Sequence, residues 1–252
     1  MSKKENIKAK PLYRIFHGLV FRACLGYTYF NTRNLKGTNH AHGERRRTSM
    51  SYKIITISRE FGSGGRTIGR KVADALGIKC YDREIIDQVA DESGFDREYI
   101  KEKGEYVPHG RIGNLMNRWS YYGPTNEERI WQIQSDIILD IADRESCVIV
   151  GRCADYLLKD RDDVLKVFLH ADMAYRAERI VRLYGETDQK PEKRLMDKDK
   201  QRKAYYQIYT DLEYGDARNY HLCLNTGALG EAYCVNLLKD VFLKKGPEPK
   251  DT

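Results

Sequence analysis

Apolar residues follow two alternating patterns between residues 53 and 242 of this 252-residue chain. Short runs that are apolar at successive positions predict strands buried on both faces of a sheet. Two such runs occur, at Cys147–Val150 and Leu165–Leu169, and three further short segments are also predicted as strands, at Lys53–Ser58, Ile78–Tyr81 and His221–Asn225. The longer segments between them carry apolar residues three or four positions apart, which predicts amphipathic helices. We therefore expect an α/β domain with a parallel sheet, covered on both faces by helices, whose ligand lies at the carboxyl edge of the strands.

The clearest helix start is a capping box made by Thr125 and Glu128, in which each side chain bonds the backbone N–H of the other residue. The helix that follows should bury a face of five isoleucines, namely Ile130, Ile133, Ile137, Ile138 and Ile141. Two further helices are expected, a highly charged one at Lys190–Tyr209 and a closing one at Leu229–Phe242.

Another helix is expected to start at Asp172, which would be its N-cap. Helical spacing places four residues on its inner face, namely Ala177, Ile180, Val181 and Tyr184. Three arginines lie three positions apart on the same segment, at Arg176, Arg179 and Arg182. We predict that these arginines lie on the outer, solvated side of the helix.

The first strand runs into a loop with three glycines in four positions, Gly62, Gly64 and Gly65, and then into an amphipathic segment from Thr67 to Leu76. In this arrangement of strand, glycine-rich loop and helix, backbone N–H groups and the positive end of the helix hold a phosphate. The alternative is a tight turn between a strand and a helix, without a ligand.

The loop departs from the pattern G-x-x-x-x-G-K-[ST], because no lysine stands in it. In one register Glu60 replaces the first glycine, Arg66 replaces the lysine and Thr67 keeps the hydroxyl. In a register shifted by one, Arg59 replaces the glycine and Gly65 replaces the lysine. We favour the first register, in which Arg66 is the cation of the loop.

Positive charge is concentrated at the N-terminus. Residues 1–50 contain 11 Lys and Arg against 2 Asp and Glu, a net charge of +9, whereas the other 202 residues contain 33 against 35, a net charge of −2. The body at 50–245 is therefore a nearly neutral domain, large enough for one core and without the basic stripe of a nucleic-acid-binding surface. We expect no nucleic-acid partner.

Residues 1–49 form a basic extension. Its apolar stretch at 12–30 is interrupted by Arg14, His17 and Arg22, so it is too broken to span a membrane, and no signal-peptide cleavage site follows it. An organelle transit peptide and a helix on a membrane surface are both compatible with this composition. We favour a third interpretation, in which Met50 is the natural start, the ends at 1–49 and 246–252 are disordered, and no membrane partner is involved.

The six cysteines form no C-x-x-C pair and no histidine cluster accompanies them, so no zinc site is predicted. Cys80, Cys147 and Cys223 lie in or beside predicted strands, where cysteine serves as a small buried apolar residue. Because no export signal is found, a reducing cytoplasm is the expected location.

Several motifs follow one another in a fixed order across residues 52–243. They are Ser-Arg-Glu-Phe-Gly-Ser-Gly-Gly at 58–65, Tyr81-Asp82, Val-Ile-Val-Gly-Arg at 148–152, Leu165–Asp172, Arg176–Arg179, Asp197–Arg202 and Leu222–Thr226. In this order they resemble the cytidylate kinase-like family. The resemblance implies a P-loop domain with a small monophosphate-binding insertion and a mobile lid. It also implies phosphoryl transfer from ATP to a nucleoside monophosphate, with CMP or dCMP as the favoured acceptor.

The resemblance implies roles for the loop residues as well. Backbone N–H groups of six residues would hold the β-phosphate of ATP, namely those of Gly62, Ser63, Gly64, Gly65, Arg66 and Thr67. The Thr67 hydroxyl would ligate Mg²⁺, and Arg66 would reach the β- and γ-phosphate oxygens. The alternative for Arg66 is a solvated side chain beside the loop.

On the acceptor side, the resemblance implies that Arg152 contacts the nucleotide and that Asp82 and Arg83 begin its pocket. The alternatives are an ion pair of Arg152 with Asp155 and, for the other two residues, a helix N-cap and a surface charge. Cys153 stands where the family usually has Asp, which puts the preference for cytosine in doubt.

The charged segment Asp197–Lys203 aligns with the lid of these kinases. Four cations lie on it, namely Lys198, Lys200, Arg202 and Lys203. Lys198 and Arg202 are the predicted catalytic cations, which would stabilise the charge of the transferring phosphoryl group. The alternative is a solvated helix with pairs such as Asp199–Lys203. Because the segment has no large apolar residue, we expect it to be mobile without ligand.

Two other functions stay open at this point. The missing loop lysine and Cys153 favour a nucleotide-binding sensor that keeps the kinase fold without turnover. A kinase of another small acceptor is the second alternative. In each case the expected partners are nucleotides or a small substrate, and the chain is expected to act as a monomer or a homodimer.

Overall fold

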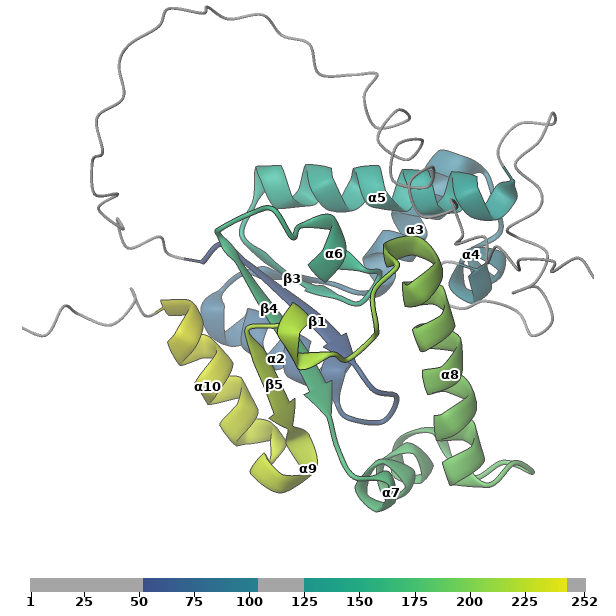
Figure 1. Cartoon of the computed structure of the whole chain (residues 1–252), viewed down its shortest axis with the longest axis vertical. Helices are drawn as coiled ribbons and strands as arrows, with labels where there is room; N and C mark the ends of the chain where they lie inside the picture. The colour runs from purple at the N-terminus through teal and green to yellow at the C-terminus, as the bar shows by residue number, and fades with distance from the viewer. Residues whose placement is uncertain (1–51, 104–124, 244–252) are drawn as a thin grey trace, which may run out of the picture. The chain divides into compact units, whose positions relative to one another are not determined.

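The computed structural model describes residues 52–103 and 125–243, which form a parallel five-stranded sheet with the order β2-β3-β1-β4-β5 (Figure 1). The strands are β1 (Ile54–Arg59), β2 (Lys79–Tyr81), β3 (Cys147–Val150), β4 (Val164–His170) and β5 (Leu222–Asn225). The α/β fold class and the five predicted strands are confirmed, with strand ends that differ by no more than one residue. The predicted extension at 1–49, the start at Met50 and the tail at 246–252 lie outside the described residues.

Helices cover both faces of this sheet. The described helices are α2 (Gly65–Leu76), α3 (Arg83–Ser93), α4 (Arg97–Lys103), α5 (Asn126–Arg144), α6 (Ala154–Leu157), α7 (Met173–Tyr184), α8 (Pro191–Thr210), α9 (Thr226–Leu229) and α10 (Glu231–Leu243), with a 3₁₀ turn η2 (Ala217–Asn219). Successive residues of β1 point to opposite faces. Ile55 and Ile57 pack with α2 and α10, whereas Ile54 packs with α3, α4 and α5. All six residues of β1 are buried, and burial on both sides is why its isoleucines occur on both faces.

The helix signals at the start of α2 and α5 are largely confirmed. Thr125 and Glu128 form the predicted capping box. Four of the five isoleucines of α5 are buried and Ile133 is partly buried. Helix α2 begins at Gly65, two residues before the expected Thr67, because Gly64 in the left-handed conformation is its N-cap. It ends at Leu76, as predicted.

Helix α7 departs from the prediction on both of its sides. Asp172 is its N-cap residue, but the Asp172 side chain makes no capping hydrogen bond. Tyr184 was expected inside and is 53% exposed, where its ring stacks on Phe61. Arg176 and Arg179 were expected outside and are only 5% and 6% exposed. The prediction is wrong for these three residues, because the polar side of α7 faces the glycine loop rather than water.

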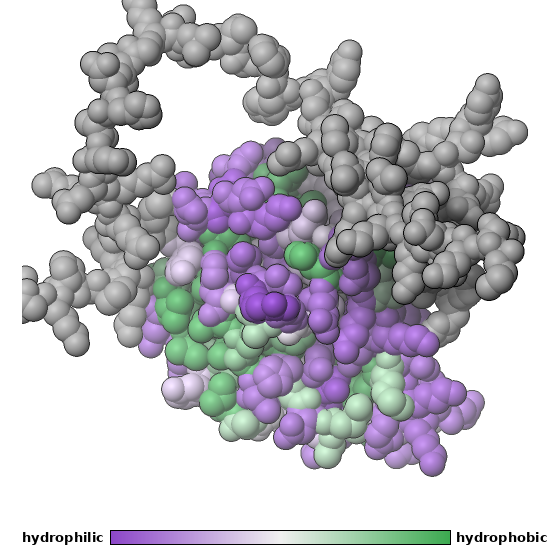
Figure 2. Space-filling view, viewed as in Figure 1, coloured by the Kyte–Doolittle hydropathy of each residue, from purple (hydrophilic) through white to green (hydrophobic). Residues whose placement is uncertain are grey.

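Helices α7 and α8 pack side by side beyond the carboxyl end of β4 (Figure 1). The outer surface of α8 is mainly hydrophilic, whereas apolar residues gather over β5 and α10 (Figure 2). Cys147 is buried and Cys80 partly so, but Cys223 is exposed. The prediction of a buried cysteine is wrong for Cys223, because it lies on the edge strand β5. Among the described residues, no helix is long and apolar enough to cross a membrane.

Candidate functional site

The glycine loop joins β1 to α2 at the carboxyl edge of the sheet (Figure 1). Gly62 and Gly64 have φ values of 84° and 92°, which L side chains rarely adopt. A Cβ at Gly62 would also lie 3.1 Å from Arg176 Cβ, so the loop passes close to α7. Helix α2 then starts at Gly65, and the N–H groups of its first turn have no partner within the helix. The loop and the helix N-terminus together form an anion-binding geometry.

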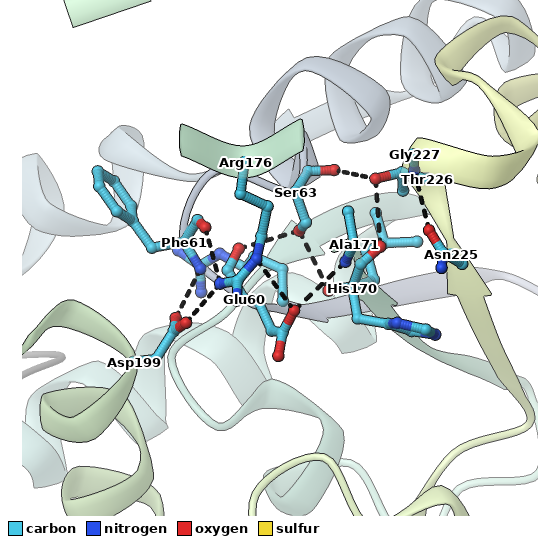
Figure 3. Close-up of polar contacts among 12 residues, drawn as sticks. Glu60, Phe61, Ser63, His170, Ala171, Arg176, Asp199, Asn225, Thr226 and Gly227 are labelled. Carbon is cyan, nitrogen blue, oxygen red and sulfur yellow. Dashed lines mark hydrogen bonds and ion pairs between the residues drawn. The ribbon is translucent and has the colours of Figure 1, made fainter. Parts of the chain in front are cut away.

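Hydroxyl groups hold this loop against β4 and α9 (Figure 3). Ser63 Oγ lies within hydrogen-bonding distance of two carbonyl oxygens, 2.9 Å from Glu60 O and 3.1 Å from Leu169 O. The Thr226 hydroxyl donates to Ser63 O at 2.7 Å. The Ser63 side chain is therefore committed to the framework, and only its backbone can face a nucleotide.

Asp199 of α8 connects the lid helix to the loop (Figure 3). Its Oδ1 accepts from the Phe61 N–H at 2.7 Å, and its Oδ2 accepts from Arg176 Nη1 at 2.6 Å. Arg176 also donates to Phe61 O at 3.2 Å and lies 3.4 Å from a carboxylate oxygen of Glu60. These polar contacts hold α8 against the loop. The sequence did not predict them, because it showed only that residues 197–203 lack large apolar side chains. The mobility of that segment stays a prediction.

Arg179 of α7 contacts Thr67, the predicted magnesium ligand. Its Nη2 donates to Thr67 Oγ1 at 2.9 Å and to Glu231 Oε1 at 2.6 Å. Lys71 contacts the same carboxylate at 3.2 Å. Burial raises the pKa of Glu231, but the hydrogen bonds from Arg179 and Lys71 outweigh burial and hold the pKa below its usual value. The Thr67 hydroxyl is thus occupied by a guanidinium.

Thr67 Oγ1 is the predicted ligand of Mg²⁺. The described residues contain no group of three His, Cys, Asp or Glu side chains that could hold a metal. Mg²⁺ keeps several waters and is commonly held by few protein oxygens together with substrate phosphates. A single hydroxyl at the start of α2 fits that chemistry, provided that Arg179 moves off Thr67 Oγ1 when the metal arrives.

Arg66 and Asp82, predicted on the donor and acceptor sides, lie together. Arg66 Nε is 2.8 Å from Asp82 Oδ2, with the Arg66 side chain 38% exposed and the Asp82 side chain 5% exposed. Asp82 is the N-cap residue of α3, but its side chain pairs with Arg66 and makes no capping bond, and its N–H donates to Glu84 Oε2 at 3.0 Å. Arg83 is exposed in the first turn of α3. The ion pair joins the loop helix α2 to the start of the predicted acceptor pocket.

The turn after β3 holds Arg152 in an uncommon conformation. Gly151, Arg152 and Cys153 have φ values of 78°, 59° and 54° in succession. A non-glycine residue in this region costs about 1–3 kcal/mol, and such strain is concentrated at functional sites. Arg152 is 4% exposed, and its Nη1 donates to Gln134 Oε1 at 3.3 Å, a neutral group.

The ion pair of Arg152 with Asp155 is not observed. Asp155 is buried and accepts from Ser58 Oγ at 3.1 Å and from the Tyr206 hydroxyl at 2.7 Å. Burial raises the pKa of Asp155 above its ordinary value, and these two hydrogen bonds oppose that rise. Asp155 therefore links three elements, β1, α6 and α8, beneath the turn that carries Arg152.

Of the predicted lid cations, the structure brings Arg202 to the site. It is 6% exposed, its Nη1 donates to Arg59 O at 3.1 Å, and its guanidinium lies 5.7 Å from the centre of the Phe61 ring. Lys198 is exposed on α8. A cavity of about 10 Å³, room for roughly one water molecule, lies between α8 and the carboxyl ends of β1 and β3. Its lining residues are Ser58, Arg59, Gly151, Arg152, Cys153, Arg202, Tyr205, Tyr206 and Tyr214.

Several polar residues of this edge were not identified from the sequence as site residues. They are Arg59, Asp155, Arg176, Arg179, Asp199 and Glu231. Arg59 could have been found, since it directly follows a predicted strand, whereas Asp155 lies beyond the turn after β3, in α6. The other four become part of the site only through contacts between distant segments.

Comparisons with known proteins agree with this geometry. The model of the cytidylate kinase-like family matches residues 54–228. A cytidylate kinase of Pyrococcus horikoshii is 28% identical over 175 residues, which cover 69% of this chain and 79% of that protein. A cytidylate kinase of Archaeoglobus fulgidus is 29% identical over 196 residues, covering 76% and 96%. A solved structure of an uncharacterized protein from Eubacterium ventriosum superimposes with a TM-score of 0.57 at 26% identity, over 75% of this chain and 97% of that chain.

Proposed function

This chain belongs to the cytidylate kinase-like family, and we propose that it transfers a phosphoryl group from ATP to a nucleoside monophosphate, with CMP or dCMP as the favoured acceptor. The observation that carries the proposal is the pairing of two anion-binding features at one sheet edge. The glycine loop with the start of α2 suits the donor phosphates. On the neighbouring strand β3, a strained turn buries Arg152 against a neutral partner.

The donor side rests on the backbone from Gly62 to Thr67. Its N–H groups bind the β-phosphate of ATP, and the partly exposed Arg66 reaches the β- and γ-phosphate oxygens when it leaves Asp82. The Thr67 hydroxyl would hold Mg²⁺, which would supply charge neutralisation for the donor phosphates. Arg179 then turns from Thr67 towards Glu231, its second partner.

The acceptor side rests on Arg152, with Asp82 and Arg83 at the entrance of the pocket. A planar guanidinium can hold a phosphate through two parallel hydrogen bonds. Because Arg152 is buried and Gln134 carries no charge, a bound phosphate would supply the anion that a buried cation requires.

Phosphoryl transfer needs positioning and charge stabilisation more than covalent chemistry from the protein. An oxygen of the acceptor phosphate attacks the γ-phosphorus, the bond to the bridging oxygen breaks, and ADP leaves with that oxygen. Arg202 stabilises the charge of the transferring group, a role supported by the burial of its side chain between α8 and the end of β1. Lys198 has the same proposed role, which requires α8 to move, since its side chain is exposed.

Two observations favour a second candidate function. No lysine stands in the glycine loop, and Cys153 replaces the expected Asp at the acceptor turn. A nucleotide-binding sensor without turnover accounts for both, and a kinase of another small acceptor accounts for Cys153.

A coupled assay of ADP release with ATP, Mg²⁺ and a panel of acceptors separates these functions. The panel contains CMP, dCMP, the other nucleoside monophosphates and small hydroxyl metabolites. Turnover that is fastest with CMP or dCMP supports the proposal, and turnover with another acceptor reassigns the substrate. ATP binding with no turnover of any acceptor identifies the sensor. Arg152→Met is the matched inactive control, and exposed Arg182→Met on α7 is the matched active one.

A further inference from the structure

Gln134 is a polar residue on the buried side of α5. It is 0% exposed, and it shares that side of the helix with the buried isoleucines Ile130, Ile137, Ile138 and Ile141. A buried amide costs free energy unless its polar groups find hydrogen-bond partners. The partners of Gln134 therefore show why a polar side chain is kept at this position.

Both groups of the Gln134 amide bond residues of other elements. Its Oε1 accepts from Arg152 Nη1 at 3.3 Å, and its Nε2 donates to the Tyr205 hydroxyl at 3.4 Å. The orientation of the amide is fixed by chemistry, because a guanidinium only donates and therefore requires the amide oxygen. Gln134 thus joins α5 to the turn after β3 and to α8.

Arg152 and Tyr205 line the small cavity at the carboxyl edge of the sheet, whereas Gln134 contacts both and does not line it. Arg152 is 4% exposed and lies in a turn with a φ of 59°. A guanidinium has five N–H donors, and the bond to Gln134 uses one of them. Gln134 can therefore orient this cation without standing where a ligand would bind.

The charge of the partner decides how an arginine can bind a phosphate. Arg176 is buried to a similar degree, but a carboxylate oxygen of Asp199 lies 2.6 Å from its guanidinium. A carboxylate offsets the positive charge and competes with a phosphate for the same donors. The amide of Gln134 accepts a hydrogen bond from Arg152 and carries no charge, so it leaves the positive charge to a ligand.

We propose that Gln134 is a positioning residue, which orients Arg152 towards the acceptor phosphate and leaves the charge of Arg152 to that phosphate. It acts through Arg152 and does not contact the substrate. This assignment rests on the proposed function. The competing role is a structural one, in which the amide only links α5 to α8.

Two substitutions of similar length separate these roles. Gln134→Met removes both hydrogen bonds, whereas Gln134→Glu keeps an acceptor for Arg152 and adds a negative charge. In the full-length protein we expect the KM for CMP to rise about 10-fold in Gln134→Met, the effect of one lost hydrogen bond to a charged group. In Gln134→Glu it should rise about 100-fold, because the phosphate then competes with a charge-assisted bond. The KM for ATP should stay within about threefold of wild type in both variants.

Gln132 lies at an exposed position of the same helix, and Gln132→Met and Gln132→Glu are the matched controls, which should keep wild-type KM values. A structural role predicts the opposite order, since glutamate can keep the bond to Arg152 and methionine cannot. A KM for CMP that is no higher in Gln134→Glu than in Gln134→Met would overturn the proposal. An equal rise in the KM for ATP would do the same.

Binding of CMP and of cytidine, measured by calorimetry without ATP, decides the question if Gln134→Glu does not fold. Cytidine has no phosphate, so Gln134→Met should weaken CMP binding about 10-fold and leave cytidine binding unchanged. Equal losses for the two ligands would mean that the amide only shapes the pocket, and the proposal would fall.

The same comparison separates this inference from the kinase assignment. If the wild type binds CMP but transfers to no acceptor, the kinase assignment falls, and the difference between CMP and cytidine still tests Gln134. If another nucleoside monophosphate is the acceptor, it and its nucleoside take the places of CMP and cytidine. A wild type that binds the monophosphate no more tightly than the nucleoside would overturn the proposal, because Arg152 would then hold no phosphate.

Discussion

Asp199 of α8 contacts the glycine loop and Arg176, and its removal should lower the free energy of unfolding. Asp199→Ala takes the closest carboxylate, 2.6 Å away, from an Arg176 side chain that is only 6% exposed. It also leaves the Phe61 N–H without its acceptor. Removing one partner of a buried ion pair costs about 3–5 kcal/mol. Because Glu60 remains 3.4 Å from Arg176 Nε, we expect a loss at the lower end, about 3 kcal/mol in the free energy of unfolding.

Urea unfolding of the full-length protein measures this cost in two backgrounds. In Arg176→Met no buried cation is left behind, so the same change should cost about 1 kcal/mol, the value of one hydrogen bond. The difference, about 2 kcal/mol, is the coupling between the two side chains. Glu192→Ala, at an exposed position of the same helix, is the matched control and should stay within about 0.5 kcal/mol of wild type. Equal costs of Asp199→Ala in both backgrounds would refute the ion pair as the anchor of α8.

Four further predictions test other parts of the site. Arg152→Met should raise the acceptor KM or lower kcat while ATP binding stays nearly intact, and equal damage to ATP binding would place it on the donor side. Arg66→Ala should weaken ATP binding or turnover by about 1–3 kcal/mol, measured by calorimetry and steady-state kinetics; unchanged values would remove Arg66 from the site. The lowered pKa of Glu231 means that it contributes stability above its ordinary pKa of about 4.5, and that this contribution is lost as the pH falls through the lowered value. The gap in melting temperature between wild type and Glu231→Gln should therefore be wide at neutral pH and shrink in acid, and a constant gap would contradict this. A chain that starts at Met50 should melt and bind ATP like the full chain, since the family match begins at residue 54; a large loss of melting temperature would show that the extension packs on the body.

The strands could be predicted because their environment is simple. A central parallel strand is buried on both faces, so β3 is apolar at every position and β1 carries isoleucines on both faces, a pattern that the sequence shows directly. The capping box at Thr125 is equally local, since both partners lie within one turn. The edge strand β5 is less constrained, and Cys223 on it is exposed.

The polar side of α7 could not be predicted in the same way. Spacing shows that Arg176, Arg179 and Arg182 share one side of the helix, but it does not show whether that side meets water or another polar segment. Arg182 is exposed, whereas the other two are buried by carboxylates that come from α8 and α10. Those partners are set by tertiary packing, which helical periodicity does not contain.

The arginines at the carboxyl edge divide into two groups with different consequences for binding. The first group lies against carboxylates: Arg66 with Asp82, Arg176 with Asp199, and Arg179 with Glu231. The second lines a cavity without acidic lining in the described part of the chain: Arg59, Arg152 and Arg202. A phosphate that approaches the first group competes with a carboxylate, whereas the described residues that line the cavity include no carboxylate. We therefore expect donor binding to loosen the contacts of α7 with the loop, because a phosphate there competes with the carboxylates that hold Arg176 and Arg179.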